Sequence, residues 1–174
     1  MWTSIEGFQH LKKEEIDALV EAPVLITILV GMADGELDGQ ERTWSERLLR
    51  SRTYNKPKEL NEFYRVVAEG FWARVQSEVA HLPNDTEARS SELSERLAKL
   101  NPILAKLDLE LAADLYKGFV GLAEETAKAS GGFLRIGAVS PEEKKWMNLP
   151  MLTPIVALKK QQEDKDEGNG EGEN

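Results

Sequence analysis

The sequence predicts an all-α protein, a single helical domain of about seven to eight helices with an internal pseudo-twofold repeat. Apolar residues recur at intervals of three and four along most of the chain, which is typical of helices with one buried face. No segment alternates between apolar and polar residues as a half-buried strand does. A length of 174 residues suits one helical core.

Composition excludes several classes of protein. The chain has no cysteine, which excludes disulfides and thiolate metal sites. Its net charge of −9 disfavours a nucleic-acid partner, whose phosphates are also negative, and suits divalent cations or basic protein surfaces. The longest apolar run, Pro23 to Ala33, is too short to span a bilayer, and the N-terminus shows no secretory signal. We therefore expect a cytoplasmic protein without direct membrane insertion.

The first half of the chain predicts helices joined by polar turns. Lys12 to Val20 indicates a short helix. Pro23 is expected to open a second helix, apolar nearly all round and therefore central, that ends near Ala33. A polar turn from Asp34 to Glu41, here called the acidic loop, leads into a third helix. The apolar pattern then predicts one long helix over Lys58 to His81.

The second half follows a break at Pro83 to Asp85 and begins with a helix whose leucines recur up to Leu100. Asn101 followed by Pro102 predicts a cap and a first-turn proline. The helix that they open is expected to be the second long one and to extend to Thr126.

The C-terminal part is less regular. Ser130 to Gly137 is rich in glycine but lacks the strand and the lysine of a phosphate-binding loop, so it predicts an interhelical connection. Thr153, followed by Pro154, is expected to cap a last helix. From residue 161 onward the chain is too polar to bury a core. We therefore expect a helical domain over residues 1–160 and an acidic, flexible tail over residues 161–174.

Two short stretches repeat the same order of residue types. Asp38 to Trp44 and Ser140 to Trp146 each contain a cap, a first-turn residue, a glutamate, a base and a tryptophan. Leu29 to Ala33 likewise resembles Phe119 to Ala123. These pairs predict two related helical halves packed face to face.

The alignment of the two halves is open between two choices. Either Val120 to Glu124 corresponds to Val30 to Asp34, or Ala129 to Gly131 corresponds to Ala33 to Gly35. The sequence alone does not decide between them.

Helix capping explains part of the acidic pattern. Asp38 and Ser140 are favourable N-caps, and Glu41 and Glu143 stand at the third helical position, from which a carboxylate can bond back to the cap's amide. Each cap is worth roughly 0.5–2 kcal/mol. Capping alone therefore accounts for these four residues without any ligand.

Asp34 and Glu36 have no such explanation. With Asp38 and Glu41 they bring four carboxylates into one short loop, and oxygen clusters of this kind hold hard cations. The sequence therefore predicts a divalent metal site at these four residues, without distinguishing calcium, magnesium, manganese and zinc. A standard EF-hand is disfavoured, because Ser45 stands where that loop needs a bidentate glutamate.

The stretch from Met32 to Glu41, at the end of one helix and opening another, resembles the acidic motif of the TerB-like family. The resemblance covers most of the chain from Leu19 to Leu152, and Ala129 to Gly132 and Val139 to Glu143 match it less sharply. It implies an all-helical, pseudo-twofold, cytoplasmic protein whose acidic residues bind a divalent metal. The family is linked to gene systems for tellurite resistance and stress response.

By position, Asp34 and Glu41 match the family's paired acids. In the second half, Ser130 or Ile136 stands where an acid like Asp34 would be, depending on the alignment, although Glu143 is retained. The resemblance therefore implies a metal site on one side only.

Other candidate residues favour structural roles. His10 and His81 lack a partner at helical metal-binding spacing, so each is expected to be exposed or half-buried. Trp44, Trp72 and Trp146 recur with other aromatic residues at helical spacing, which predicts core positions. No nucleophile stands beside a local base, which favours a protein that is not an enzyme.

These patterns favour a non-enzymatic, TerB-like helical protein that binds a divalent cation at the acidic loop and acts through protein partners in a tellurite or metal stress response. The alternative is a metal-free helical scaffold whose acidic motif only caps helices and that docks a basic protein surface. A metal-dependent hydrolase is the third possibility.

Overall fold

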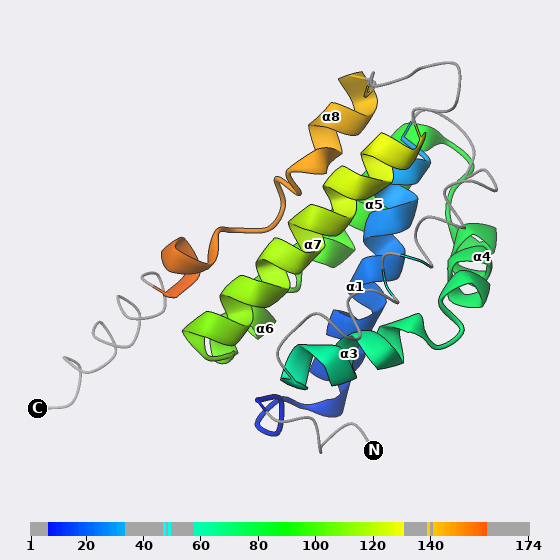
Figure 1. The fold of residues 1–174 in the computed structure, drawn as a ribbon. Helices are drawn as coiled ribbons and strands as arrows, with labels where there is room; N and C mark the ends of the chain where they lie inside the picture. Colours follow the sequence, from blue (N-terminus) through cyan, green and yellow to red (C-terminus); the bar gives the residue numbers. More distant parts are fainter. Residues whose placement is uncertain are drawn as a thin grey trace, which may run out of the picture.

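The computed structural model describes residues 7–33, 47, 49, 58–130, 139 and 141–159. All regular structure within this part of the chain is helical, which confirms the predicted fold class (Figure 1). A short helical stretch over residues 155–159 ends the described chain. The other helices are α1 Lys13–Gly31, α3 Lys58–Ala68, α4 Phe71–His81, α5 Thr86–Ala98, α6 Asn101–Lys106, α7 Leu109–Ser130 and α8 Pro141–Met147.

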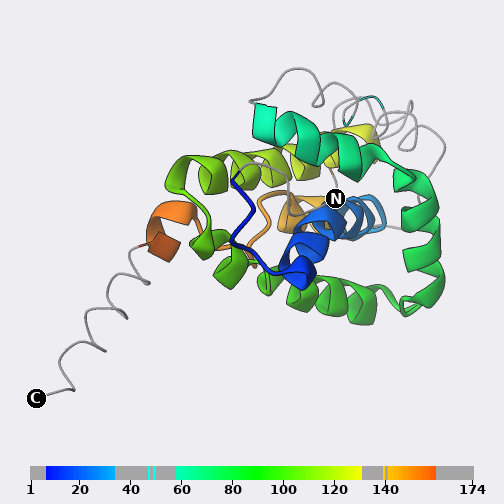
Figure 2. The ribbon, with the colours of Figure 1, turned by 90° about the horizontal axis from the view of Figure 1, so that it is seen from below.

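The helix α1 lies at the centre of the molecule, as its nearly continuous apolar sequence predicts. Every residue from Ala22 to Gly31 is buried. The helices α3, α4, α5, α7 and α8 all pack against α1, and α7 does so most extensively. Figure 2, seen from below, shows α1 enclosed by these neighbours. A helix without a polar face needs such enclosure, because any uncovered side would expose apolar surface.

The sequence predicted two helices where the structure has one, and that prediction was wrong. Pro23 lies inside α1 rather than at the start of a second helix. An interior proline costs about 3 kcal/mol through the lost hydrogen bond and the ring's clash with the preceding turn. Full burial of one leucine, isoleucine or valine contributes about 1.5–3 kcal/mol, and α1 buries such residues on both sides of Pro23. Packing therefore outweighs the proline.

Both helices that were predicted to be long are divided by a corner. The helix expected over Lys58 to His81 ends at Ala68 and restarts after Gly70, which adopts a left-handed conformation with φ of 60°. The helix expected from Asn101 to Thr126 is interrupted at Leu107, whose backbone is extended. Apolar residues are buried on both sides of each corner, so the apolar period alone does not reveal where the chain turns.

The predicted break at Pro83 to Asp85 is confirmed, and the predicted cap at Asn101 is wrong. Asp85 caps α5 after the predicted break, because its Oδ1 accepts a hydrogen bond of 2.8 Å from the amide of Ala88. Asn101 is not the cap of α6; that position belongs to Leu100. The Asn101 side chain instead donates to the carbonyl of Met151 at 3.0 Å and accepts from the amide of Thr153 at 2.9 Å. A predicted local cap is therefore a long-range clamp.

The C-terminal segment is held to α6 at a second point. Lys159 donates through Nζ to the carbonyl of Ala105 at 2.7 Å and to that of Leu107. A lysine suits this place, because the carbonyls at a helix C-terminus lack helical partners and carry partial negative charge. Asn101 and Lys159 together fix residues 151–159 against α6.

The described core includes many of the aromatic residues, while the two tryptophans that the structure describes pack at its edge. Phe63, Tyr64 and Phe119 are fully buried. Trp72 and Trp146 are only partly buried against the core, so the prediction of core tryptophans was wrong for both, and Trp44 lies outside the described residues. An indole is too large to be covered by short helices at the edge of the core.

His10 and His81 are exposed, as expected, and each ring bonds to a backbone carbonyl, of Lys106 at 2.8 Å and of Ser77 at 2.6 Å.

No helix within the described residues combines the length and the apolar character needed to cross a membrane.

The corner at Gly70 gives a direct test of the fold. A Cβ atom at this position would meet nothing within 4 Å, so Gly70→Ala adds only backbone strain. We expect this variant to lower the free energy of unfolding by about 1 kcal/mol, and Gly70→Asn to lower it less, because asparagine tolerates the left-handed region. Urea unfolding followed by circular dichroism measures both. Equal midpoints for Gly70→Ala and the wild type would contradict the proposed need for a left-handed residue.

Candidate functional site

The predicted metal ligands Asp34, Glu36, Asp38 and Glu41 all lie outside the described residues. Among the residues that the structure does describe, no group of three or more His, Cys, Asp or Glu side chains could hold a metal ion. The structure does fix the place where the acidic loop begins. Met32 is the C-cap of α1, and the buried Ala33 directly precedes the loop.

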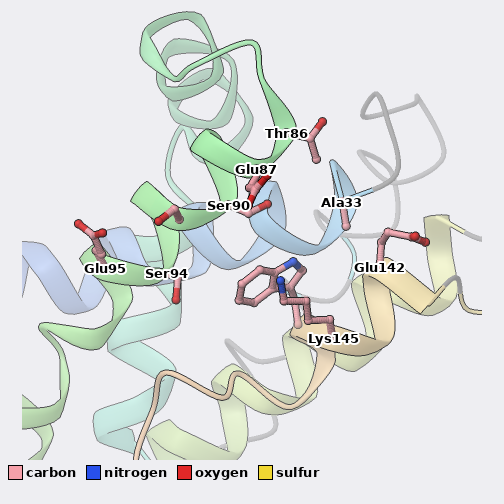
Figure 3. A pocket seen from close by; sticks show the side chains of 10 residues that line it. Ala33, Thr86, Glu87, Ser90, Ser94, Glu95, Glu142 and Lys145 are labelled. Carbon is pink, nitrogen blue, oxygen red and sulfur yellow. The ribbon is translucent and has the colours of Figure 1, made fainter.

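A cleft of about 490 Å³ opens at this place, between the end of α1, the outer face of α5 and α8 (Figure 3). We call it the serine cleft. The described residues that line it are Ala33 after α1, Thr86, Glu87, Ser90, Ser91, Ser94 and Glu95 on α5, and Glu142, Lys145 and Trp146 on α8.

The sequence of α5 explains why the cleft is open. Its inner face carries Leu93 and Leu97, which are fully buried. The side toward α8 carries the exposed Ser91, the half-buried Ser94 and the buried Ser90, whose side chains are too short to fill the space toward α8. Across the cleft, α8 contributes the partly buried indole of Trp146. Small residues on one wall and a large flat one on the other leave a hollow with an aromatic surface.

The cleft is negative overall. Glu87, Glu95 and Glu142 contribute three carboxylates and Lys145 one ammonium, a formal net charge of −2 on the lining. The Nζ atom of Lys145 lies 4.5 Å from the centroid of the Trp146 ring. A cation thus already rests on the indole face, where the ring's negative quadrupole attracts it.

Arg89 fixes the inner edge of the cleft. Its side chain is buried and donates to the carbonyl of Met32 at 3.0 Å, across 57 positions of sequence. It also donates to the carbonyls of Pro83 and Asn84, at 3.3 and 3.0 Å, and to the hydroxyl of Thr86 at 3.4 Å. A cation at a helix C-terminus is favourable, because the carbonyls there carry partial negative charge. Arg89 therefore joins the start of α5 to the end of α1, two residues before the acidic loop.

Sequence analysis missed both Arg89 and the serine cleft. Arg89 stands four and eight positions before Leu93 and Leu97, on the stripe that α5 buries. An arginine on a buried stripe is the pattern that could have predicted it, because a buried guanidinium needs several acceptors. The cleft had no such pattern, since serines on or beside a buried stripe are ordinary.

The structure brings together the regions of the two predicted repeats. Ala33 precedes the first motif, α8 carries residues of the second, and both line the serine cleft. The helices α1 and α7 run side by side (Figure 1), but Val120 to Glu124 lies inside α7, which continues to Ser130. The end of α7 therefore favours the alignment of Ala129 to Gly131 with Ala33 to Gly35. The repeat itself stays a prediction.

The second motif is partly described. Glu143 lies in the first turn of α8 and is only 1% exposed. Its proposed cap, Ser140, lies outside the described residues. The capping arrangement in this half therefore stays a prediction.

A second, smaller hollow of about 340 Å³ lies at the junction of α1, α3 and α4. Arg74 crosses it and pairs with Glu21 at 3.5 Å between Nη1 and Oε2. Burial raises the pKa of the Glu21 carboxyl above its ordinary value of 4.5, and the nearby Arg74 only partly offsets this. The residues that line this hollow are Asp17, Val20, Glu21, Val66, Glu69 and Arg74.

Comparison with known proteins adds no assignment to this geometry. No protein-family model matches the chain, and neither a characterised protein nor a solved structure is similar to it at a significant level. Function has to be argued from the residues themselves.

The clamp formed by Arg89 is expected to be important for stability. Arg89→Met keeps the apolar stem but leaves buried carbonyls without a donor, so it should lower the free energy of unfolding by about 2–4 kcal/mol. Arg89→Lys should recover only part of this loss, because one ammonium cannot reach acceptors on two separate segments. Urea unfolding measures both.

Arg65→Met is the matched control. Arg65 is 62% exposed and pairs only at the surface with Glu62, so its loss should change stability by less than about 0.5 kcal/mol. An Arg89→Met variant as stable as Arg65→Met would contradict the role of the clamp.

The raised pKa of Glu21 predicts a dependence of stability on pH. Between pH 4.5 and the pKa of the folded state, the folded protein binds more protons at Glu21 than the unfolded chain does. The resulting stabilisation is complete below pH 4.5 and is lost as the pH rises through the folded-state pKa. Glu21→Gln should remove this loss, so the stability of the variant relative to the wild type should increase with pH from about 4.5 upward. Urea unfolding at several pH values tests this, and a constant difference would contradict it.

Proposed function

We propose that this is a non-enzymatic, TerB-like helical protein that binds a divalent cation through Asp34, Glu36, Asp38 and Glu41. We further propose that it acts through protein partners in a tellurite or metal stress response. The observation that best supports this is the position of Ala33, the residue directly before the acidic loop. Ala33, the residue before Asp34, lines an open, negatively charged cleft.

The described geometry supports a cation site in two ways. Arg89 and the buried Ala33 hold the chain at the point where the loop starts, which lowers the entropy that a ligand would have to overcome. The cleft carboxylates also make the surroundings of that point attractive to cations. Oxygen ligands of the kind in the loop are those that calcium, magnesium and manganese prefer, and zinc also accepts carboxylates.

The same cleft supports action through a partner. An accessible hollow with a partly buried indole and several hydroxyls provides apolar contact and hydrogen bonds in one place, as protein-binding surfaces do. The non-enzymatic part of the proposal rests on the sequence, which places no nucleophile beside a local base.

One observation favours the alternative, a metal-free scaffold whose acidic motif only caps helices. Asp85 caps α5 through its carboxylate and belongs to no group of acids that could hold a metal among the described residues. Asp38 could serve in the same way. The two hypotheses differ over Asp34 and Glu36, for which capping provides no role.

Calorimetric titration of the full chain with calcium, magnesium, manganese and zinc tests the metal site. We expect one bound ion per chain for at least one metal, and loss of binding in Asp34→Ala and Glu36→Ala. Asp38→Ser should keep the cap but remove a charge, so it should lower the affinity for the metal ion by about tenfold or more. The melting temperature of the metal-free protein should stay unchanged, because the cap is kept.

Glu110→Ala, at an exposed position on α7, is the control for a general change of charge and should bind like the wild type. If no metal produced heat and none raised the melting temperature, the metal site would be rejected and the scaffold hypothesis retained.

A further inference from the structure

We propose that the serine cleft binds a basic peptide segment of a partner protein, with an arginine side chain seated on the indole of Trp146. This inference rests on the proposed function only for the claim that the protein acts through partners. It concerns a different set of atoms from the metal ligands, all within the described residues. Its support comes from the length of the cleft, its charge and the state of the indole.

The length of the cleft suits an extended peptide. Its polar wall on α5 runs from Glu87 to Glu95, which at 1.5 Å per residue is about 12 Å along the helix axis. About four residues of extended chain cover this distance at 3.3 Å each. The serines along that wall can donate to and accept from a peptide backbone at any register.

The negative charge of the cleft favours a positively charged ligand. Glu95 and Glu142 lie toward opposite ends of the cleft, with Lys145 between them (Figure 3). A segment with two basic residues could therefore meet a carboxylate at each end. Acidic peptides and phosphate groups would be repelled, both here and by the net charge of −9 on the whole chain.

The indole shows what chemistry the middle of the cleft accepts. The ammonium of Lys145 lies 4.5 Å from the ring centroid, so the chain's own cation occupies the position that we assign to the partner. Lys145 is exposed, and a contact of this kind at the surface is weak enough to be displaced. An arginine of the partner peptide is favoured over a lysine, because a planar guanidinium stacks on an indole while its edge donates hydrogen bonds to carboxylates. Lys145 is therefore an internal competitor of the ligand.

Fluorescence anisotropy of the full chain with labelled hexa-arginine, hexalysine and hexaglutamate peptides tests the proposal. We expect hexa-arginine to bind more tightly than hexalysine, hexaglutamate not to bind, and affinity to fall as salt is raised. The double variant Glu95→Gln, Glu142→Gln should weaken the binding of hexa-arginine by about tenfold. Lys145→Met should raise the affinity for hexa-arginine by about threefold, because it removes a repulsive charge and also the ammonium that competes for the indole of Trp146.

The matched control is Asp17→Asn, Glu69→Gln, which removes the same two charges from the smaller hollow. If hexa-arginine were attracted only by the general negative charge, both double variants would lower its affinity equally. Lys145→Met would then raise the affinity no more than Lys117→Met, which changes an exposed position on α7. That result, absence of hexa-arginine binding, or binding of hexaglutamate would overturn the proposal.

Titrations in EDTA and with Asp34→Ala separate this proposal from the metal site. Peptide binding that persists in both conditions supports the cleft even if calorimetry finds no metal. Metal binding without any peptide binding would reject the cleft and leave the metal site intact. Circular dichroism of each variant confirms that the helices are retained, as expected for substitutions at exposed glutamates.

Discussion

The burial of the second half of α1, from Ala22 to Gly31, is the constraint on which the rest of the structure depends. A helical segment that is apolar on every side must be surrounded, and α1 is covered by α3, α4, α5, α7 and α8. This requirement explains the corners at Gly70 and Leu107, since straight helices as long as the apolar pattern suggested could not wrap a single central helix. It also explains why Pro23 is tolerated, because the burial around it stabilises the helix by more than the proline costs.

Burying α1 to its last turn creates a second requirement, and Arg89 meets it. Carbonyls at the end of a helix have no partner within the helix and need donors from elsewhere. The guanidinium that bonds to Met32 O belongs to α5, so the same contact fixes where α5 begins. Ser90, Ser91 and Ser94 lie on or beside the stripe of Leu93 and Leu97 and line the cleft toward α8. The serine cleft thus follows from how the central helix is completed.

The sequence predicted what local periodicity and local caps determine. The helical class, the central position of α1 and the break before Thr86 were all predictable, because each depends on neighbouring residues. Pro23, Gly70 and Asn101 were misjudged because their roles depend on distant parts of the chain; the amide of Asn101 bonds to residues about fifty positions away. The cleft was invisible for the same reason, since its walls come from three separate helices. The metal assignment at Asp34 to Glu41 remains a prediction.

The divalent cation and the basic peptide are both positively charged, so the binding of one is expected to affect the binding of the other. Ala33 lines the cleft, and the proposed metal ligands begin at the next residue of the chain. A divalent cation held by these residues would reduce the negative charge that attracts a basic peptide if it lay within about one Debye length, roughly 8 Å, of the cleft. Thermodynamic linkage requires this effect to be reciprocal, so the bound partner would lower the affinity for the metal ion by the same factor. On this argument, metal and partner act in opposition, and a rise in metal concentration would release the partner rather than recruit it.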